Sequence, residues 1–168
     1  SLNFFLNQKL ISITEIKKRN LNFHARYSAK ERIYEYIILN RIAPPSLDKN
    51  KVWHIRKKLD LEIMKKGAKK LLGTHDFSTF RASNCYSKSP IRTMKKINIK
   101  RINKKVVIQF KSKSFLRNQV RSMVGCLKYL GEKKWSLKKF TEVFKSKKRT
   151  LCAPPAPSHG LFLEKVIY

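Results

Sequence analysis

The stretch KSFLRNQVRSMVGCLKYLG, residues 113–131, decides the fold that this sequence predicts. Ser114 is the expected N-cap of a helix, and Gly131 is the residue expected to end it. One side of that helix is apolar, because residues of this kind recur at spacings of three and four: Leu116, Val120, Met123, Val124, Leu127 and Leu130. The stretch therefore predicts a helix that buries one face in a core.

Basic residues of the same stretch fall beside that apolar face. At about 100° per residue, Arg117, Arg121 and Lys128 form a narrow stripe at its border. Guanidinium groups at such a border suit the binding of carboxylate or phosphate in a cleft. The alternative is a core helix with ordinary solvated cations, and the pattern alone favours that alternative.

The rest of the chain predicts an α+β domain, residues 1–168, with a mostly antiparallel sheet and two or three packed helices. Strands are expected at 10–16, in the later part of 23–40, at 49–55 and 160–168, and in a hairpin, 95–101 with 105–110, that turns at Asn103-Lys104. Further helices are expected at 60–72 and 136–147, the second capped by Ser136. The long loop 74–90 is expected to be functional.

Composition points to a polyanionic partner. The chain carries 40 Lys and Arg against 10 Asp and Glu, a formal net charge of +30. Such a field attracts nucleic acid, and no helix has the basic, aromatic amphipathic character that a membrane surface would need. Part of the lysine excess resembles a coding bias. With no membrane-spanning run and no signal-peptide pattern, we expect a cytoplasmic protein.

Cofactor and metal motifs are missing from the sequence. The three cysteines lie far apart without a CxxC, the four histidines stand alone, and neither GxGxxG nor GxxxxGK[ST] occurs. We therefore expect no metal and no nucleotide cofactor. Asp76 lies in an arginine- and aromatic-rich loop as a possible catalytic acid, although a turn-forming role is favoured for it.

An RNA site needs arginines for phosphates and aromatic rings for unstacked bases. The chain interleaves these two kinds of residue: Arg81, Arg92, Arg117 and Arg121 with Tyr34, Phe77, Phe80, Tyr86 and Phe115. Taken singly, each aromatic residue is more simply explained as core. Tyr34 differs, because its strand position lets it line a pocket while its ring is buried.

Four stretches together resemble the TruA-type tRNA pseudouridine synthases. They occur in the order and at the spacing of that family: FHARYSA (23–29) with RIYEY (32–36); GTHDFSTFR (73–81) with SPIR (89–92); SFL (114–116) with VRSMVG (120–125); and AP (156–157) with GLFL (160–163) and VIY (166–168). The resemblance extends over nearly the whole chain.

The resemblance implies an enzyme that flips a uridine out of the anticodon stem-loop of tRNA, at tRNA positions 38 to 40, and isomerises it without a cofactor. By motif position, Tyr34 stacks on the target base and its hydroxyl can handle the C5 proton. Arg121 orients the catalytic Asp, and Leu161 and Leu163 pack around the cleft. The family is dimeric, so a homodimer is expected for the full-length protein. Arg81, Arg92 and Arg117 are the further expected substrate-binding residues.

One departure limits what this chain can do. The family's nucleophilic Asp stands in a GRTDAGVH motif, and nothing like it occurs here. The chain therefore resembles the C-terminal portion of the enzyme, with the catalytic Asp upstream, and we expect it to bind RNA without turnover. The alternative is a non-catalytic RNA-binding module, in which Tyr34 and Arg121 have no need to meet in one cleft. A metal- or thiol-dependent enzyme would need Cys and His clusters that the spacing does not supply.

Overall fold

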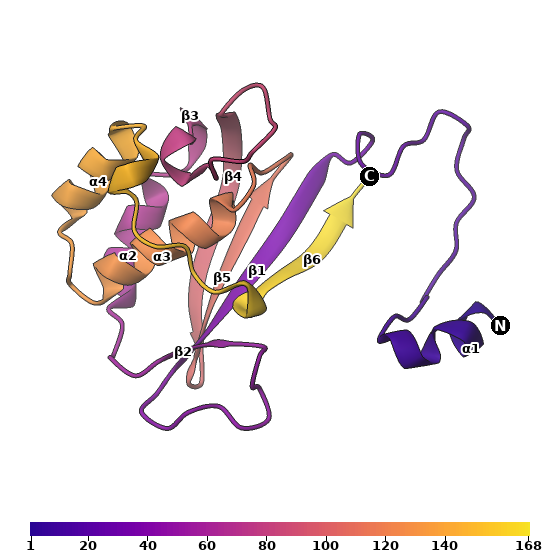
Figure 1. Cartoon of the computed structure of the whole chain (residues 1–168), viewed down its shortest axis with the longest axis horizontal. Coiled ribbons are helices and arrows are strands. Elements are labelled where there is room, and N and C mark those ends of the chain that lie inside the picture. Colours follow the sequence, from indigo (N-terminus) through magenta and orange to yellow (C-terminus); the bar gives the residue numbers. More distant parts are fainter.

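The computed structural model describes residues 1–168 and contains one six-stranded sheet with its larger helices gathered beside it (Figure 1). The sheet order is β2-β1-β5-β4-β3, and β6 also pairs with β1. All pairings are antiparallel except that of β1 with β2. The strands are β1 (Glu31–Asn40), β2 (Trp53–Ile55), β3 (Gly73–Asp76), β4 (Ile91–Ile102), β5 (Lys105–Ser112) and β6 (Leu161–Ile167). The predicted α+β class is confirmed.

The chain also contains four α-helices and four short 3-10 turns, of which α1 and η1 precede the first strand. The helices are α1 (Leu2–Leu6), α2 (Leu61–Lys69), α3 (Gln119–Gly131) and α4 (Leu137–Lys145). The 3-10 turns are η1 (Asn7–Lys9), η2 (Ser78–Phe80), η3 (Arg149–Leu151) and η4 (Ser158–Gly160). None of the helices is both long and apolar enough to cross a membrane.

The core lies between the sheet and helix α3. Strand alternation directs Tyr36 and Ile38 of β1 and Phe110 of β5 to the helical side, where all three are fully buried. The apolar face of α3 meets them, and its Met123 and Leu127 are also fully buried. Each such side chain contributes roughly 1.5–3 kcal/mol of burial, so α3 is held mainly by this face, as its sequence predicts.

The predicted hairpin is confirmed. Strands β4 and β5 pair from Ile102 with Lys105 down to Met94 with Ser112. The turn between them places Asn103 at φ 52°, in the left-handed region that asparagine tolerates better than most residues. The hairpin supplies two of the three central strands of the sheet.

Helix α3 begins later than its sequence suggests. The expected N-cap Ser114 is wrong: Asn118, at φ 61°, precedes the first helical residue. Ser114 instead lies in the irregular segment before the helix, where its carbonyl accepts a hydrogen bond of 2.8 Å from the Ser112 hydroxyl. Gly131 is the last helical residue, and Glu132 caps the helix. Residues 113–118 are thereby left free to form a wall outside the helix.

The prediction that Arg117, Arg121 and Lys128 form one basic stripe along α3 is also wrong. Arg117 precedes the helix, and the Lys128 ammonium pairs with buried Glu132 at 2.8 Å. That ammonium also lies 5.7 Å from the centre of the Trp53 ring. Only Arg121 remains near the start of the helix, one turn from Arg117.

The two other predicted helices are present with shorter bounds. Helix α4 begins after Ser136, whose hydroxyl accepts a hydrogen bond of 3.1 Å from the Lys139 amide, so the predicted cap is confirmed. Helix α2 follows Asp60, whose carboxylate accepts from the amides of Glu62 and Ile63. The predicted loop 74–90 in fact contains most of β3 and all of η2, so its irregular part is 81–90.

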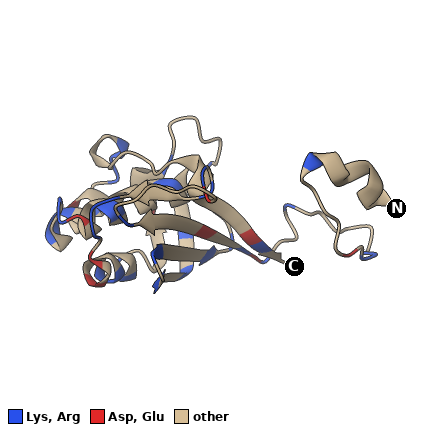
Figure 2. Cartoon of the chain, turned by 90° about the horizontal axis from the view of Figure 1, so that it is seen from below, with Lys and Arg blue, Asp and Glu red and all other residues tan.

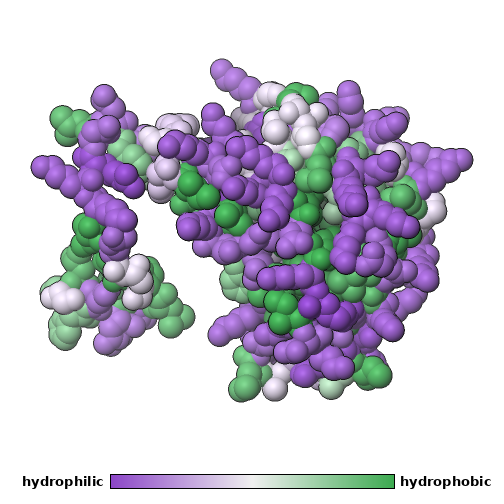
Figure 3. Space-filling model, turned by 180° about the vertical axis from the view of Figure 1, so that it is seen from behind, coloured by the Kyte–Doolittle hydropathy of each residue, from purple (hydrophilic) through white to green (hydrophobic).

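Residues 1–22 form an arm that lies away from the sheet (Figure 1). The strand predicted at 10–16 is wrong, because this segment pairs with no other strand and an alternating pattern forms a strand only beside a partner. Its main fastening to α1 is a pair of hydrogen bonds between the Asn3 side chain and the Ile13 backbone. Exposed apolar residues mark the arm as a separate lobe (Figure 3): Leu2, Phe4, Phe5, Leu10, Ile11, Ile16 and Leu21.

Helix α3 packs closely against the connector of residues 152–157. A Cβ atom on Gly125 would lie only 2.1 Å from the Pro154 carbonyl oxygen. We expect Gly125→Ala to lower the free energy of unfolding by roughly 1–3 kcal/mol, because a backbone carbonyl cannot turn aside as a side chain can. Urea denaturation followed by tryptophan fluorescence measures the loss.

Gly131→Ala is the matched control, since its added Cβ would meet the flexible end of Met64 at 2.7 Å. We expect the control to lose less stability than Gly125→Ala. Equal losses in the two variants would contradict the assigned role of the Pro154 carbonyl.

Candidate nucleic-acid interface

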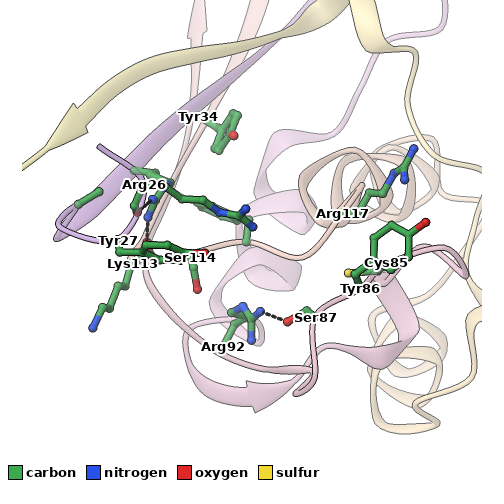
Figure 4. A pocket seen from close by; sticks show the side chains of 13 residues that line it. Arg26, Tyr27, Tyr34, Cys85, Tyr86, Ser87, Arg92, Lys113, Ser114 and Arg117 are labelled. Carbon is green, nitrogen blue, oxygen red and sulfur yellow. Dashed lines mark hydrogen bonds between the residues drawn. The ribbon is translucent and has the colours of Figure 1, made fainter. Parts of the chain in front are cut away.

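A pocket of about 570 Å³ opens between the start of β1, the loop 82–90 and the turn 113–117 (Figure 4). None of its 13 lining residues is acidic. Five are cations, namely Arg26, Arg32, Arg92, Lys113 and Arg117. Four are aromatic, namely Tyr27, Tyr34, Tyr86 and Phe115. We call this the basic pocket; its lining combines the two kinds of group that bind phosphates and bases.

A smaller pocket of about 240 Å³ adjoins the basic pocket. Tyr34, Phe115 and Arg117 line both. The smaller pocket adds Arg121 from the first turn of α3 and Leu161 from the start of β6. We call it the tyrosine pocket. Residues from β1, α3 and β6, which are far apart in the chain, therefore meet at one place.

Tyr34 is positioned by the alternation of β1. It lies two residues before the fully buried Tyr36, so both rings point to the helical side of the sheet. Helix α3 does not cover the sheet completely at this end, so Tyr34 is only half-buried. Its ring meets Phe115 edge to face, with centroids 5.1 Å apart. This contact fixes the ring while part of it remains open to the pockets.

Arg121 is held by neutral partners. Its Nε donates to the Ala156 carbonyl at 2.6 Å, and its Nη1 donates to the Asn118 side-chain oxygen at 3.3 Å. All nine ion pairs of the chain use lysine, so no carboxylate of the chain neutralises Arg121. The guanidinium is therefore oriented and still carries its full charge beside the tyrosine pocket.

Arg92 and Arg117 line the basic pocket with different degrees of freedom. Arg92 donates to the carbonyls of Ser89 and Ile91 and to the Ser87 hydroxyl, at 2.6–2.9 Å. Burial lowers the pKa of its guanidinium, which nevertheless stays charged, as arginine does in proteins. Arg117 makes one long bond of 3.4 Å to the Asn84 carbonyl and is exposed. Arg92 is thus fixed in the pocket wall, and Arg117 can move to meet a ligand.

Arg81 lines neither pocket. Its Nη2 donates to the Cys85 carbonyl at 2.7 Å and to the Ser87 carbonyl at 2.6 Å. These two bonds hold the loop that carries Tyr86 and Ser87 into the basic pocket. The contacts of Arg81 are thus with its own chain, and its predicted contact with RNA stays a prediction.

Asp76 also lies outside both pockets. Its carboxylate accepts a hydrogen bond of 2.8 Å from the Ser78 amide, and the Lys147 ammonium is 3.6 Å away. Burial alone would raise its pKa, but the hydrogen bonds from Ser78 and the charge of Lys147 hold the pKa below its usual value. These contacts favour the turn-forming interpretation over the catalytic one.

Several pocket residues were not singled out from the sequence. Arg26, Arg32 and Lys113 line the basic pocket, and the Arg32 guanidinium bridges the Arg26 and Lys113 carbonyls. A signal for Arg32 was present, because it stands two residues before Tyr34 and so shares its face of β1. Leu163, which the resemblance places near the cleft, is exposed on β6 and lines neither pocket.

No group of three or more His, Cys, Asp or Glu residues lies together in the structure in a way that could hold a metal ion. Lysine and arginine are spread over helices, loops and strands alike (Figure 2). The basic pocket and the tyrosine pocket both combine cations and aromatic rings with a concave shape.

Comparison with known proteins gives consistent matches. The family model described as tRNA pseudouridine synthase matches residues 68–168. A protein of Pelagibacter ubique named tRNA pseudouridine synthase A is 69% identical over the whole chain, which covers 68% of that protein. Proteins of the same name from Caulobacter vibrioides and Paramagnetospirillum magneticum are 42% and 43% identical over the whole chain, which covers 68% and 66% of them.

The different contacts of Arg81 and Arg117 predict different effects on stability. We expect Arg81→Ala to lower the free energy of unfolding by roughly 1.5–3 kcal/mol, the usual worth of hydrogen bonds to a charged group. Arg117→Ala should change it by less than about 0.5 kcal/mol, as is usual for exposed residues. Urea denaturation of both variants checks the contrast. Equal stability of the two variants would show that Arg81 does not order the loop.

Proposed function

The chain belongs to the tRNA pseudouridine synthase family, and on that premise we propose that its two adjoining pockets receive a flipped uridine and the phosphates beside it. The relatives named above are tRNA pseudouridine synthases, so the activity is an isomerisation within tRNA. The single observation that carries the proposal is the meeting of Tyr34 and Arg121 in the tyrosine pocket. A passive RNA-binding surface would have no need for that meeting.

Tyr34 is the proposed platform for the uracil ring. Extruding a base from its stack costs a few kcal/mol, and stacking on an aromatic ring returns roughly 1–3 kcal/mol. The half-buried ring is already fixed by Phe115, so little side-chain freedom is lost when a base stacks on it. Its hydroxyl is the proposed group that handles the C5 proton, and Leu161 supplies an apolar wall.

Arg121 is the proposed partner of the nucleophilic carboxylate. Its guanidinium is oriented by Ala156 and Asn118 and has no ion-pair partner in this chain. A carboxylate that docks against it would be held ionised and aligned. Neither pocket is lined by an acid of this chain, so we infer that the Asp comes from a segment upstream of residues 1–168.

The basic pocket is the proposed site for the phosphates that flank the flipped nucleotide. Arg92 is fixed in its wall and Arg117 is free to adjust, and no acid opposes them. Arginine forks match phosphate oxygens in two-point contacts, which gives both attraction and orientation. In this proposal Arg81 acts through the loop that it orders.

The exposed apolar residues of the N-terminal arm support the inference that more chain packs here. Seven large apolar side chains of residues 1–22 are exposed, which is costly unless another surface covers them. We propose that the upstream segment carrying the Asp covers this arm. A homodimer of the full-length protein and a cytoplasmic location, where tRNA is found, are part of the same proposal.

Taken alone, the 168-residue chain is therefore proposed to bind tRNA without isomerising it. We expect filter binding to detect a complex that weakens steeply with salt, and no tritium release from tRNA labelled at C5 of uridine. A protein surface that attracts RNA only through the charge of its lysines would bind duplex DNA and tRNA alike. Duplex DNA of equal charge therefore serves as the control ligand. Tritium release by the chain alone would mean that one of its own carboxylates is the nucleophile.

The role of Arg121 is tested in a chain that can turn over. The segment that precedes the matching region of the Pelagibacter ubique relative is fused before residue 1 to restore activity. We expect Arg121→Lys in this fusion to reduce the rate of tritium release at saturating tRNA by roughly 10²-fold, because lysine cannot reproduce the two-point contact. Binding of tRNA should change less than about threefold.

Arg41→Lys is the matched control, since the Arg41 guanidinium donates to the carbonyls of Ala43 and Pro44 in a loop apart from both pockets. It should leave both measurements unchanged. If Arg121→Lys weakened tRNA binding as strongly as release, Arg121 would be a phosphate ligand and not the partner of the nucleophile.

A further inference from the structure

Two of the three cysteines, far apart in sequence, lie in contact. The Sγ atoms of Cys126 and Cys152 are 3.4 Å apart. Cys126 is fully buried on α3, whereas Cys152, directly after η3, is partly exposed. A disulfide needs about 2.05 Å between the sulfur atoms, so bond formation requires a movement of little more than 1 Å. Cys85 lies elsewhere, in the wall of the basic pocket.

The surroundings of the two thiols are unequal. The pKa of Cys152 is lowered by the hydrogen bond from the Cys126 thiol and by the nearby Arg149 guanidinium. The pKa of Cys126 is raised by the same sulfur contact and by burial. Nη1 of Arg149 is buried and has no hydrogen-bond partner, so it can stabilise negative charge beside Cys152. Cys152 is thus the partly exposed member of the pair and the more prone to ionise, whereas Cys126 is fully buried.

We propose that Cys126 and Cys152 form a reversible oxidation site for hydroperoxides, closing a disulfide between α3 and the connector 152–157. The Cys152 thiolate attacks one oxygen of the hydroperoxide, the O–O bond breaks, and the remaining oxygen leaves as water or alcohol after taking a proton. Cys152 then carries a sulfenic acid. The Cys126 sulfur attacks it, the S–O bond breaks, and the hydroxide leaves as water with the Cys126 proton.

Atoms and electrons balance over the two steps. The two thiols lose two electrons and two protons, and one hydroperoxide is reduced by two electrons to water and an alcohol, or to two waters. A small thiol such as glutathione reverses the reaction by thiol–disulfide exchange. The exchange would begin at Cys152, since this residue is partly exposed whereas Cys126 is fully buried.

The disulfide would join α3 to the connector 152–157, two segments that are already in contact next to Arg121. The Ala156 amide donates to the Arg121 carbonyl at 3.0 Å, and Gly125 packs against the Pro154 carbonyl. Cys126 follows Gly125 directly, and Cys152 begins the connector. Oxidation therefore links α3 to the connector with a movement of little more than 1 Å between the sulfur atoms, and it stabilises the arrangement that the reduced chain already has.

The test uses the 168-residue chain and equimolar hydrogen peroxide at neutral pH. Titratable thiols should fall from three to one, and peptide mapping without reductant should find Cys126 linked to Cys152. Dithiothreitol should restore three thiols. The oxidised chain should melt about 5 °C or more above the reduced chain, since the bond closes a loop of some 25 residues.

Variants separate this pair from general thiol oxidation. Cys85→Ser should keep the link, and Cys126→Ser should stop at a sulfenic acid on Cys152 that dimedone traps. Arg149→Gln should slow oxidation about threefold for each unit by which the Cys152 pKa rises, because part of the lost thiolate is offset by stronger nucleophilicity. Lys148→Gln, which changes an exposed neighbouring charge, should leave the rate unchanged.

The proposal would be overturned by a link that includes Cys85, by a link between two chains, or by three thiols that persist after peroxide treatment. A link that forms equally fast in urea would also overturn it, because the folded contact would then have no part in the reaction. The test does not involve RNA, so its outcome is independent of the proposed synthase function.

Discussion

The site depends on one backbone contact, the packing of the connector 152–157 against α3. The amide of Ala156 donates to the Arg121 carbonyl, and the Arg121 guanidinium donates back to the Ala156 carbonyl. Gly125, without a side chain, allows the approach. The same connector then passes Pro157, whose carbonyl accepts from the buried Tyr36 hydroxyl at 2.7 Å, and leads into β6 with Leu161. A shift at this contact would therefore move Arg121 and Leu161 relative to Tyr34 together.

Charges are divided between lysine and arginine in a way that suits RNA. Lysines take all nine ion pairs, whereas Arg32, Arg81, Arg92 and Arg121 donate to carbonyl or hydroxyl oxygens of the chain. A carbonyl orients a guanidinium without cancelling its charge. The pocket walls are thereby rigid and still strongly positive, which is the condition for attracting a phosphate into a fixed position.

Sequence reasoning succeeded where local chemistry decides the structure. The hairpin turn at Asn103, the Ser136 cap and the apolar face of α3 all depend on residues within one turn or one strand. It failed where the outcome depends on distant partners. Residues 10–16 alternate correctly but meet no partner strand. The pocket itself could be expected only through resemblance, since Tyr34 and Arg121 are brought together by the whole fold.

The pairing of β1 with β6 also has a consequence for synthesis on the ribosome. Tyr34 is translated before its pocket partner Leu161 and before the strand β6 that pairs beside it. At about 5–20 residues per second, the 127 residues between them take roughly 6–25 s to translate. Throughout that interval residues 31–36 of β1 lack their partner strand β6, and the tyrosine pocket lacks the wall that Leu161 supplies. A nascent chain surrounded by ribosomal RNA and tRNA thus completes the tyrosine pocket only after β6 has been translated.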